Sequence, residues 1–181
     1  MATKEINDNF SKAWTDGTGF AVILSGSDSD APHVAKIAKA LGDYGIPYDA
    51  RVCSAHKQAE ELHHVLRSYE NGAKGPKVYI STSSLTGALS GVASWQVIRG
   101  PVLSCPSDIP NSSCTGNPSG SSNAYIEKPA NVARCAAQIL AWNNPKILQR
   151  LADSKQEKIQ SLERADSEFN KRIDCLVQTL S

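Results

Sequence analysis

The chain has 181 residues, of which 40% are hydrophobic and 20% are charged, and its net charge is +1. A chain of this size and composition is typical of one soluble globular domain with a substantial core. The near-neutral charge offers no basic surface for a polyanion, which disfavours a nucleic-acid partner.

The cysteines and the first residues indicate where the protein resides. Five cysteines are scattered without a C-x-x-C pair, so we expect no metal site of ordinary zinc spacing and a reducing compartment. Residues 1–19 are polar, resemble neither a signal peptide nor a membrane span, and are predicted to form a flexible lead-in. We therefore expect a cytoplasmic protein with no membrane partner.

From residue 20 the chain alternates predicted strands and helices. The apolar run 20–24 predicts a buried strand, and Asp30 is expected to cap the helix that follows. A strand at 48–53, a helix at 58–70 and a strand at 77–81 come next. Strands and helices in this order indicate right-handed βαβ units and a parallel sheet.

The second half of this α/β domain, which we place at 20–143, has weaker patterns. We predict a short helix at 86–95, a strand at 101–104, a loop at 107–122, a strand at 124–126 and a helix at 129–142.

Residues 144–181 form a separate segment, which is predicted to be one long helix. Its apolar stripe consists of Ile147, Leu151, Ile159, Leu162, Phe169, Ile173 and Leu176. A small sheet cannot cover a stripe of that length, so we expect the helix to pack on a neighbouring subunit. The alternative is a helix that packs on its own domain and frays at its end.

Polar loops follow the first two predicted strands, at Ser25–Asp30 and at Cys53–Lys57. In an open α/β sheet, such loops lie at the carboxyl ends of the strands and form the ligand crevice. They offer hydroxyls, helix-start amides, a carboxylate, an imidazole and an ammonium group, which suit a phosphorylated metabolite and a proton transfer. Each loop taken alone is equally compatible with an ordinary helix-capping turn.

Together the motifs resemble a known family. G-S-x-S-D after the first strand, then G-I-P-Y and S-A-H-K, are similar to the AIR carboxylase (PurE-type) family of purine biosynthesis. The S-A-H-K form resembles the class II branch, which includes the carboxylase half of the bifunctional animal enzyme. The resemblance covers roughly residues 20 to 145.

The resemblance implies a flavodoxin-like three-layer α/β/α sandwich that assembles into a homo-tetramer or homo-octamer with sites at subunit junctions. It implies a phosphoribosylaminoimidazole carboxylase, a carbon–carbon lyase that adds CO2 to aminoimidazole ribonucleotide (AIR) without a cofactor or metal. The product is carboxyaminoimidazole ribonucleotide (CAIR). Class I members instead rearrange an N-carboxylated precursor.

The resemblance also assigns residues. His56 is the expected catalytic residue, because an imidazole can take the proton that the ring carbon loses. Lys57 would supply positive charge, and Asp30 would accept hydrogen bonds from the ribose. The expected substrate-binding residues are Gly26, Ser27, Ser29, Asp30, Ser54, Ala55, Lys57, Thr86, Ser90, Gly91, Pro118, Ser119 and Gly120.

Two segments depart from the family pattern. Where class II members carry A-G-R-S-N, this chain has Ser83–Gly87, and the segment 107–117 is short. One hypothesis is a working carboxylase in which Thr86, Ser90 and the Asn111 loop replace the missing groups. The alternative is an impaired paralogue that binds a ribonucleotide or serves as a scaffold. A third reading is an unrelated flavodoxin-like binding module.

Overall fold

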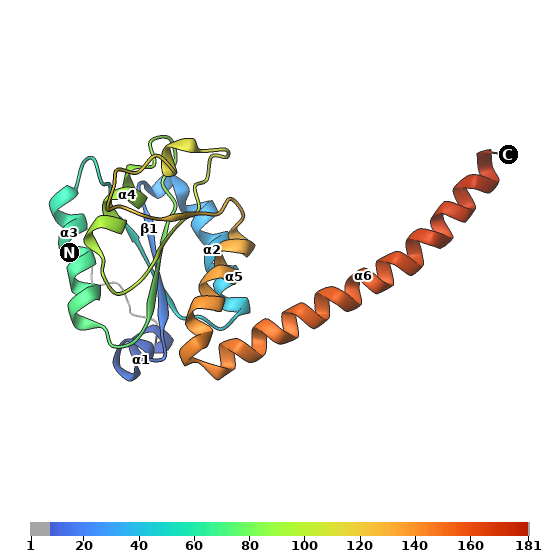
Figure 1. Cartoon of the computed structure of the whole chain (residues 1–181), viewed down its shortest axis with the longest axis horizontal. Helices are drawn as coiled ribbons and strands as arrows, with labels where there is room; N and C mark the ends of the chain where they lie inside the picture. Colours follow the sequence, from blue (N-terminus) through green and yellow to red (C-terminus); the bar gives the residue numbers. More distant parts are fainter. Residues whose placement is uncertain (1–7, 181) are drawn as a thin grey trace.

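A computed structural model describes residues 8–180 and contains a parallel five-stranded sheet between two layers of helices (Figure 1). The strands are β1 (Phe20–Ser25), β2 (Tyr48–Val52), β3 (Lys77–Ser81), β4 (Val102–Ser104) and β5 (Ala124–Tyr125), in the order β2-β1-β3-β4-β5. This arrangement confirms the predicted flavodoxin-like α/β/α sandwich. No helix among the described residues is long and apolar enough to cross a membrane.

Helices cover both faces of the sheet, which explains why every residue of β1 and β3 is buried. α2 (Ala31–Asp43) and α5 (Pro129–Leu140) lie on one face, against Ala21 and Ile23 of β1. The other face carries α1 (Asp8–Asp16), α3 (Ala59–Gly72) and α4 (Ala88–Gln96), and it receives Val22 and Leu24 of the same strand. Short 3-10 turns occur at Asp28–Asp30, Ser112–Cys114 and Ala141–Asn143.

The segment before β1 differs from the prediction of a flexible lead-in. Residues 8–16 form α1, which buries Phe10 and Ala13 against the sheet. The Trp14 ring stacks with Phe20 at a centroid distance of 6.1 Å and also contacts Tyr69. An aromatic cluster therefore fixes α1, and the polar residues around it concealed this apolar face in the sequence. Residues 1–7 lie outside the described part of the chain.

The long C-terminal helix forms as predicted, but its apolar stripe is divided between two environments. α6 spans Pro145–Leu180, and only its first turns pack on the domain, where Ile147 and Leu151 are buried. Ile159, Leu162 and Phe169 are exposed on the part that projects away from the domain (Figure 1).

A buried lysine connects the sheet to the end of α3. Lys77 begins β3 with 1% of its surface exposed, and its Nζ donates to the carbonyl oxygens of Tyr69 (2.9 Å) and Ala73 (3.4 Å). A cation at this position stabilises the carboxyl end of a helix. Burial lowers the pKa of Lys77, while the nearby carboxylate of Glu70 opposes that shift.

Glu70 completes this network. Its carboxylate accepts from the Tyr79 hydroxyl at 2.7 Å and from the backbone N–H groups of Ile98 and Arg99 at 3.0 Å each. Burial alone would raise the pKa of Glu70, but these hydrogen bonds and the charge of Lys77 together lower it. The carboxylate therefore joins α3, β3 and the segment after α4.

We predict that Glu70→Gln lowers the free energy of unfolding at pH 7 by about 1.5–3 kcal/mol, the usual contribution of hydrogen bonds to a charged group. Because the folded pKa is depressed, this contribution is complete above the unfolded pKa and is lost as the pH falls through the folded pKa. The difference between the variant and the unsubstituted protein should therefore narrow below about pH 4.5. Urea unfolding at several pH values measures this difference in the free energy of unfolding. The exposed Glu168→Gln is the control. A difference that stays constant with pH would contradict the prediction.

Candidate functional site

The loops that carry the predicted site residues all leave the carboxyl edge of the sheet. Ser25, the last residue of β1, pairs in register with Val52 of β2, and Leu24 pairs with Ser81 of β3. The Cys53 N–H donates to the Ser25 carbonyl oxygen at 2.8 Å, which holds the first residues of the two key loops together. The connections from β1 and β3 run to opposite faces, so this edge is the topological switch point at which such folds bind ligands.

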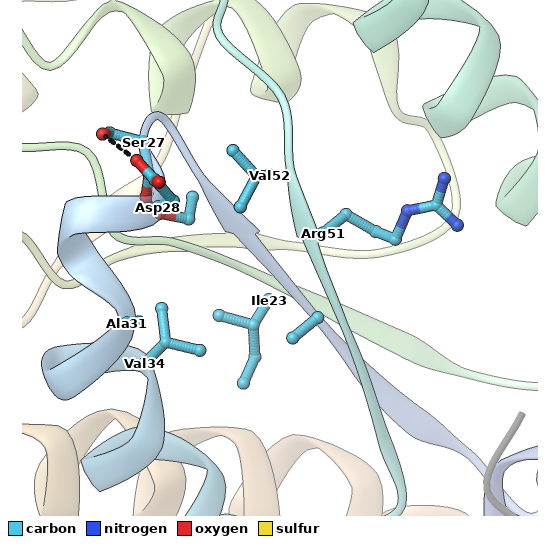
Figure 2. A pocket seen from close by; sticks show the side chains of 9 residues that line it. Ile23, Ser27, Asp28, Ala31, Val34, Arg51 and Val52 are labelled. Carbon is cyan, nitrogen blue, oxygen red and sulfur yellow. Dashed lines mark hydrogen bonds between the residues drawn. The ribbon is translucent and has the colours of Figure 1, made fainter. Parts of the chain in front are cut away.

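The loop after β1 is organised around Ser27. Its Oγ accepts from the backbone N–H of Ser29 at 3.2 Å and from the Ser29 hydroxyl at 2.9 Å. Ser27 and Asp28 line a small cavity of about 100 Å³ above an apolar floor that includes Ile23 and Val34. Figure 2 shows that the Arg51 guanidinium, although it borders this cavity, points away from both residues. The exposed Ser29 hydroxyl and the start of α2 remain accessible from solvent.

Asp30 stands at the start of α2, but its side chain does not cap the helix as predicted. The residue is only 5% exposed, and its carboxylate accepts from the hydroxyls of Ser107 (2.9 Å) and Ser25 (3.3 Å). These bonds connect the loop after β1 to the loop after β4. Both carboxylate oxygens are engaged, so Asp30 in this conformation positions loops and does not face a cavity.

The loop after β2 presents the imidazole and the ammonium group to solvent. The backbone N–H of Lys57 donates to Ser54 Oγ at 3.3 Å, and the Ser54 N–H donates to Gln58 Oε1 at 3.3 Å. These bonds close a tight turn in which His56 and Lys57 are exposed. The two side chains border an open cavity of about 600 Å³, which is also lined by His64 of α3.

Four other predicted residues meet at the start of α4. Thr86, Gly91, Pro118 and Ser119 line a cavity of about 570 Å³. Its remaining walls include the exposed indole of Trp95, to which the sequence had not pointed, and Asn117 of the segment 107–117. The cavity therefore combines a flat aromatic surface with hydroxyl and amide groups.

The two segments that depart from the family pattern are bonded to each other behind this cavity. Asp108 accepts from the Leu85 N–H at 2.8 Å, while Asn111 Nδ2 donates to the Leu85 carbonyl oxygen at 3.0 Å and to Asp108. Burial would raise the pKa of Asp108, but the bonds from Asn111 and Leu85 lower it. The Ser113 hydroxyl accepts from the Gly87 N–H and donates to the Leu85 carbonyl oxygen. These hydrogen bonds hold Leu85 at a φ of +62°, a conformation that leucine rarely adopts.

Two further predicted substrate-binding residues make contacts within the protein itself. Ser90 is fully buried in α4, and its hydroxyl donates to the Gly87 carbonyl oxygen at 3.0 Å. Gly120 has a φ of +94°, which favours glycine, and packs against the Trp95 ring. Of the groups expected to replace the family's missing arginine and asparagine, Thr86 and the Asn111 loop line the cavity at α4, the loop through Ser113, Gly116 and Asn117. The Ser90 and Asn111 side chains instead bond to the protein itself.

A buried thiol near this edge is not a nucleophile. Cys105 follows β4, and His33 Nε2 lies 3.6 Å from its sulfur. Burial raises the pKa of the Cys105 thiol to about 12, so the thiol is protonated at neutral pH. The burial of this thiol argues against a Cys–His pair as the chemical centre.

Seven of the predicted site residues line three separate cavities of one chain. Ser27 lines the first, His56 and Lys57 line the second, and the third is lined by Thr86, Gly91, Pro118 and Ser119. The cavity at Ser27 is smaller than the roughly 300–1,000 Å³ usual for ligand pockets, whereas the other two fall in that range. Beneath them, the hydroxyls of Ser81, Ser83 and Ser104 are buried without a hydrogen-bond partner among the described residues. These three hydroxyls lie at the carboxyl ends of β3 and β4. In the sequence, only the run of small polar residues after β3 indicates them.

Comparison with known proteins identifies the family of this chain. Residues 21–161 match the family model described as AIR carboxylase. Phosphoribosylaminoimidazole carboxylase of Treponema denticola is 34% identical over 158 residues, which cover 83% of this chain and 97% of the relative. The bifunctional carboxylase and succinocarboxamide synthetase of Mus musculus is 37% identical over 151 residues, covering 80% of this chain and 35% of that protein.

A solved structure agrees as well. The crystal structure of Treponema denticola PurE superposes with a TM-score of 0.77 at 34% identity, covering 83% of this chain and 98% of that one. The matched region contains the loops after β1 and β2, the cavity at α4 and the first turns of α6. The chain belongs to the AIR carboxylase family.

Proposed function

We propose that this protein is a phosphoribosylaminoimidazole carboxylase that adds CO2 to the ring carbon of AIR and gives CAIR. One observation carries the proposal: the S-A-H-K turn lies beside the Ser-rich loop at the switch point of the sheet, in a chain similar to relatives named as this carboxylase. We place the reaction at this edge and the protein in the cytoplasm. The free thiols of Cys53, Cys105 and Cys114, all buried, are compatible with a reducing compartment.

The chemistry requires one proton to be moved. Aminoimidazole is an enamine, so its ring carbon attacks CO2 directly and a carbon–carbon bond forms. The ring carbon then carries both a hydrogen and the new carboxylate, and it regains aromaticity when the C–H bond breaks. The electron pair returns to the ring and the proton passes to His56, whose imidazole can release it to solvent. The same imidazole protonates the ring carbon in the reverse direction.

The remaining groups hold the substrate. The Ser29 hydroxyl is exposed and suits the phosphate. The backbone at the start of α2 offers less, because the Ala31 N–H donates to Asp28 and Pro32 has no N–H. Lys57 adjoins the imidazole in the same turn and would attract the phosphate or the developing carboxylate. Thr86, with the cavity beside Trp95, would accommodate the heterocycle. Asp30 would act by keeping the loop after β1 in place through Ser25 and Ser107.

A homo-oligomer is part of the proposal. His56 and Thr86 line different cavities of one chain, so a complete pocket requires surfaces from a second chain or movement of the loops. Trp95 and Ile98, which are 70% and 92% exposed, provide apolar surface near the cavity at α4. We therefore propose a tetramer or octamer with sites at the junctions between subunits.

We predict that His56→Asn lowers the rate of CAIR formation by about 10²–10⁴-fold, the usual contribution of a general acid–base group. The assay mixes purified protein with AIR and bicarbonate and follows the carboxylated product by absorbance. His63→Asn is the matched control, because His63 lies on the exposed side of α3 and contacts Gln96. Full turnover by His56→Asn would refute the catalytic assignment. AIR binding without turnover by the unsubstituted protein would identify an impaired paralogue instead.

We predict that Ser29→Ala raises KM for AIR about tenfold and leaves kcat nearly unchanged, because a phosphate contact is made equally in the ground and transition states. Ser29 is preferred to Ser27, whose Oγ also organises the loop. Steady-state kinetics measure both parameters, and Ser29→Thr, which keeps the hydroxyl, should restore KM. A fall in kcat at constant KM would contradict a phosphate-binding role.

We predict that a chain ending at Ser154 forms smaller assemblies than the full chain, because it lacks the projecting part of α6. Truncation at this point keeps Ile147 and Leu151, which the domain buries, so the domain should still fold. Light scattering gives the mass, and circular dichroism checks the fold. An unchanged mass would show that α6 is not used in assembly.

A further inference from the structure

α6 carries a regular line of side chains along its length, which we call the seam. It consists of Leu148, Ala152, Lys155, Ile159, Leu162, Asp166, Phe169, Ile173, Leu176 and Leu180. Successive members are alternately four and three residues apart along the whole helix. This is the heptad spacing of helices that pair with another helix along their length.

The domain of the same chain does not cover the seam. Leu148, Leu162 and Phe169 are 58%, 58% and 59% exposed, and Leu180 is 88% exposed. The residues that α6 buries against its own domain, Ile147 and Leu151, lie outside the seam. Figure 1 shows α6 leaving the domain as one continuous helix. The seam is therefore available to a partner from end to end.

We propose that the seam pairs with the seam of a second copy of this chain, and that the two helices run antiparallel. In the symmetric pairing centred between Gln160 and Ser161, Ile159 of one copy faces Leu162 of the other. The same symmetry sets Leu148 opposite Ile173, and Ala152 opposite Phe169, so that a small side chain receives a large one.

The two charged members of the seam select this orientation. In the antiparallel pairing, Lys155 of each copy faces Asp166 of the other, which gives two ion pairs between the chains. In a parallel pairing, Lys155 would face Lys155 and Asp166 would face Asp166, and like charges opposed in an interface are unfavourable. Within residues 8–180 of one chain, neither side chain forms a hydrogen bond or an ion pair.

The antiparallel pairing also fits the ends of the helix. Leu180 of the second copy would reach the base of α6, next to Trp142, which is 90% exposed. The overlap from Leu148 to Ile173 is roughly 40 Å long at 1.5 Å per residue. The pairing of the two seams would be a specific contact in the proposed homo-oligomer. Its tests do not measure turnover, so they can fail or succeed independently of the carboxylase activity.

Cysteine cross-linking of the full chain tests the orientation. Cys175 is exposed, so Cys175→Ser is the background for an affinity-tagged chain carrying Ala152→Cys and an untagged chain carrying Phe169→Cys. After mixing and mild oxidation, we expect the tagged–untagged disulfide dimer to dominate. Each chain alone should give less than a tenth of that yield, because identical positions would lie roughly 25 Å apart along the helix axis. Efficient cross-linking of either chain with itself would establish a parallel pair, and the absence of any dimer would refute helix pairing.

Charge reversal tests the role of Lys155 and Asp166. Lys155→Asp and Asp166→Lys should each weaken self-association at least tenfold, because each places like charges face to face, and the double variant should restore it to within about threefold. Sedimentation of the full chain over a range of concentrations measures the association. Charge reversal at Lys158 and Glu163, which flank the seam, is the control. It should weaken self-association less than reversal at Lys155 or Asp166. Failure of the double variant to recover association would overturn the proposed pairing.

Discussion

The pairing of β1 with β2 on one side and with β3 on the other is the constraint on which the rest of the molecule depends. Because these strands are parallel, their loops leave the same edge. The order in which successive strands are added to the sheet reverses between β1 and β3. The backbone hydrogen bond from Cys53 to Ser25 continues the ladder into the loops. The imidazole of His56 and the hydroxyl of Ser29 therefore arise from neighbouring positions, although they are 27 residues apart in the sequence.

The edge is rigid on one side and open on the other. Ser25 and Ser107 each donate to the Asp30 carboxylate beneath the first loop. Leu85, Asp108 and Asn111 form a second set of hydrogen bonds beside the cavity at α4. His56 and Lys57, in contrast, project from a turn that only backbone and short polar contacts maintain. In the proposed reaction, the fixed part would bind the ribonucleotide, while the exposed imidazole exchanges its proton with solvent.

The family match covers only the first part of α6. The match ends at residue 161, so the last part of the seam, including Phe169 and Ile173, lies beyond it. In the proposed oligomer, contacts between domain faces would therefore be separable from the contact between helices. The antiparallel pairing would place two domains at opposite ends of a helix pair, which leaves the carboxyl edges of both sheets accessible.

The sequence by itself determined the order of strands and helices from residue 20 onward, because apolar runs and helical periodicity are local properties of the chain. It also determined the two polar loops after β1 and β2, since the residues of each loop are adjacent. Only the tertiary structure decided the roles of Asp30 and Ser90, because their hydrogen bonds depend on burial and, for Asp30, on Ser107, which is 77 residues away. The docking of α1 likewise required the aromatic partners Phe20 and Tyr69. Only the tertiary structure showed which part of the α6 stripe is buried, because the domain covers only the first turns of the helix. Helical periodicity in the sequence does not indicate where that cover ends.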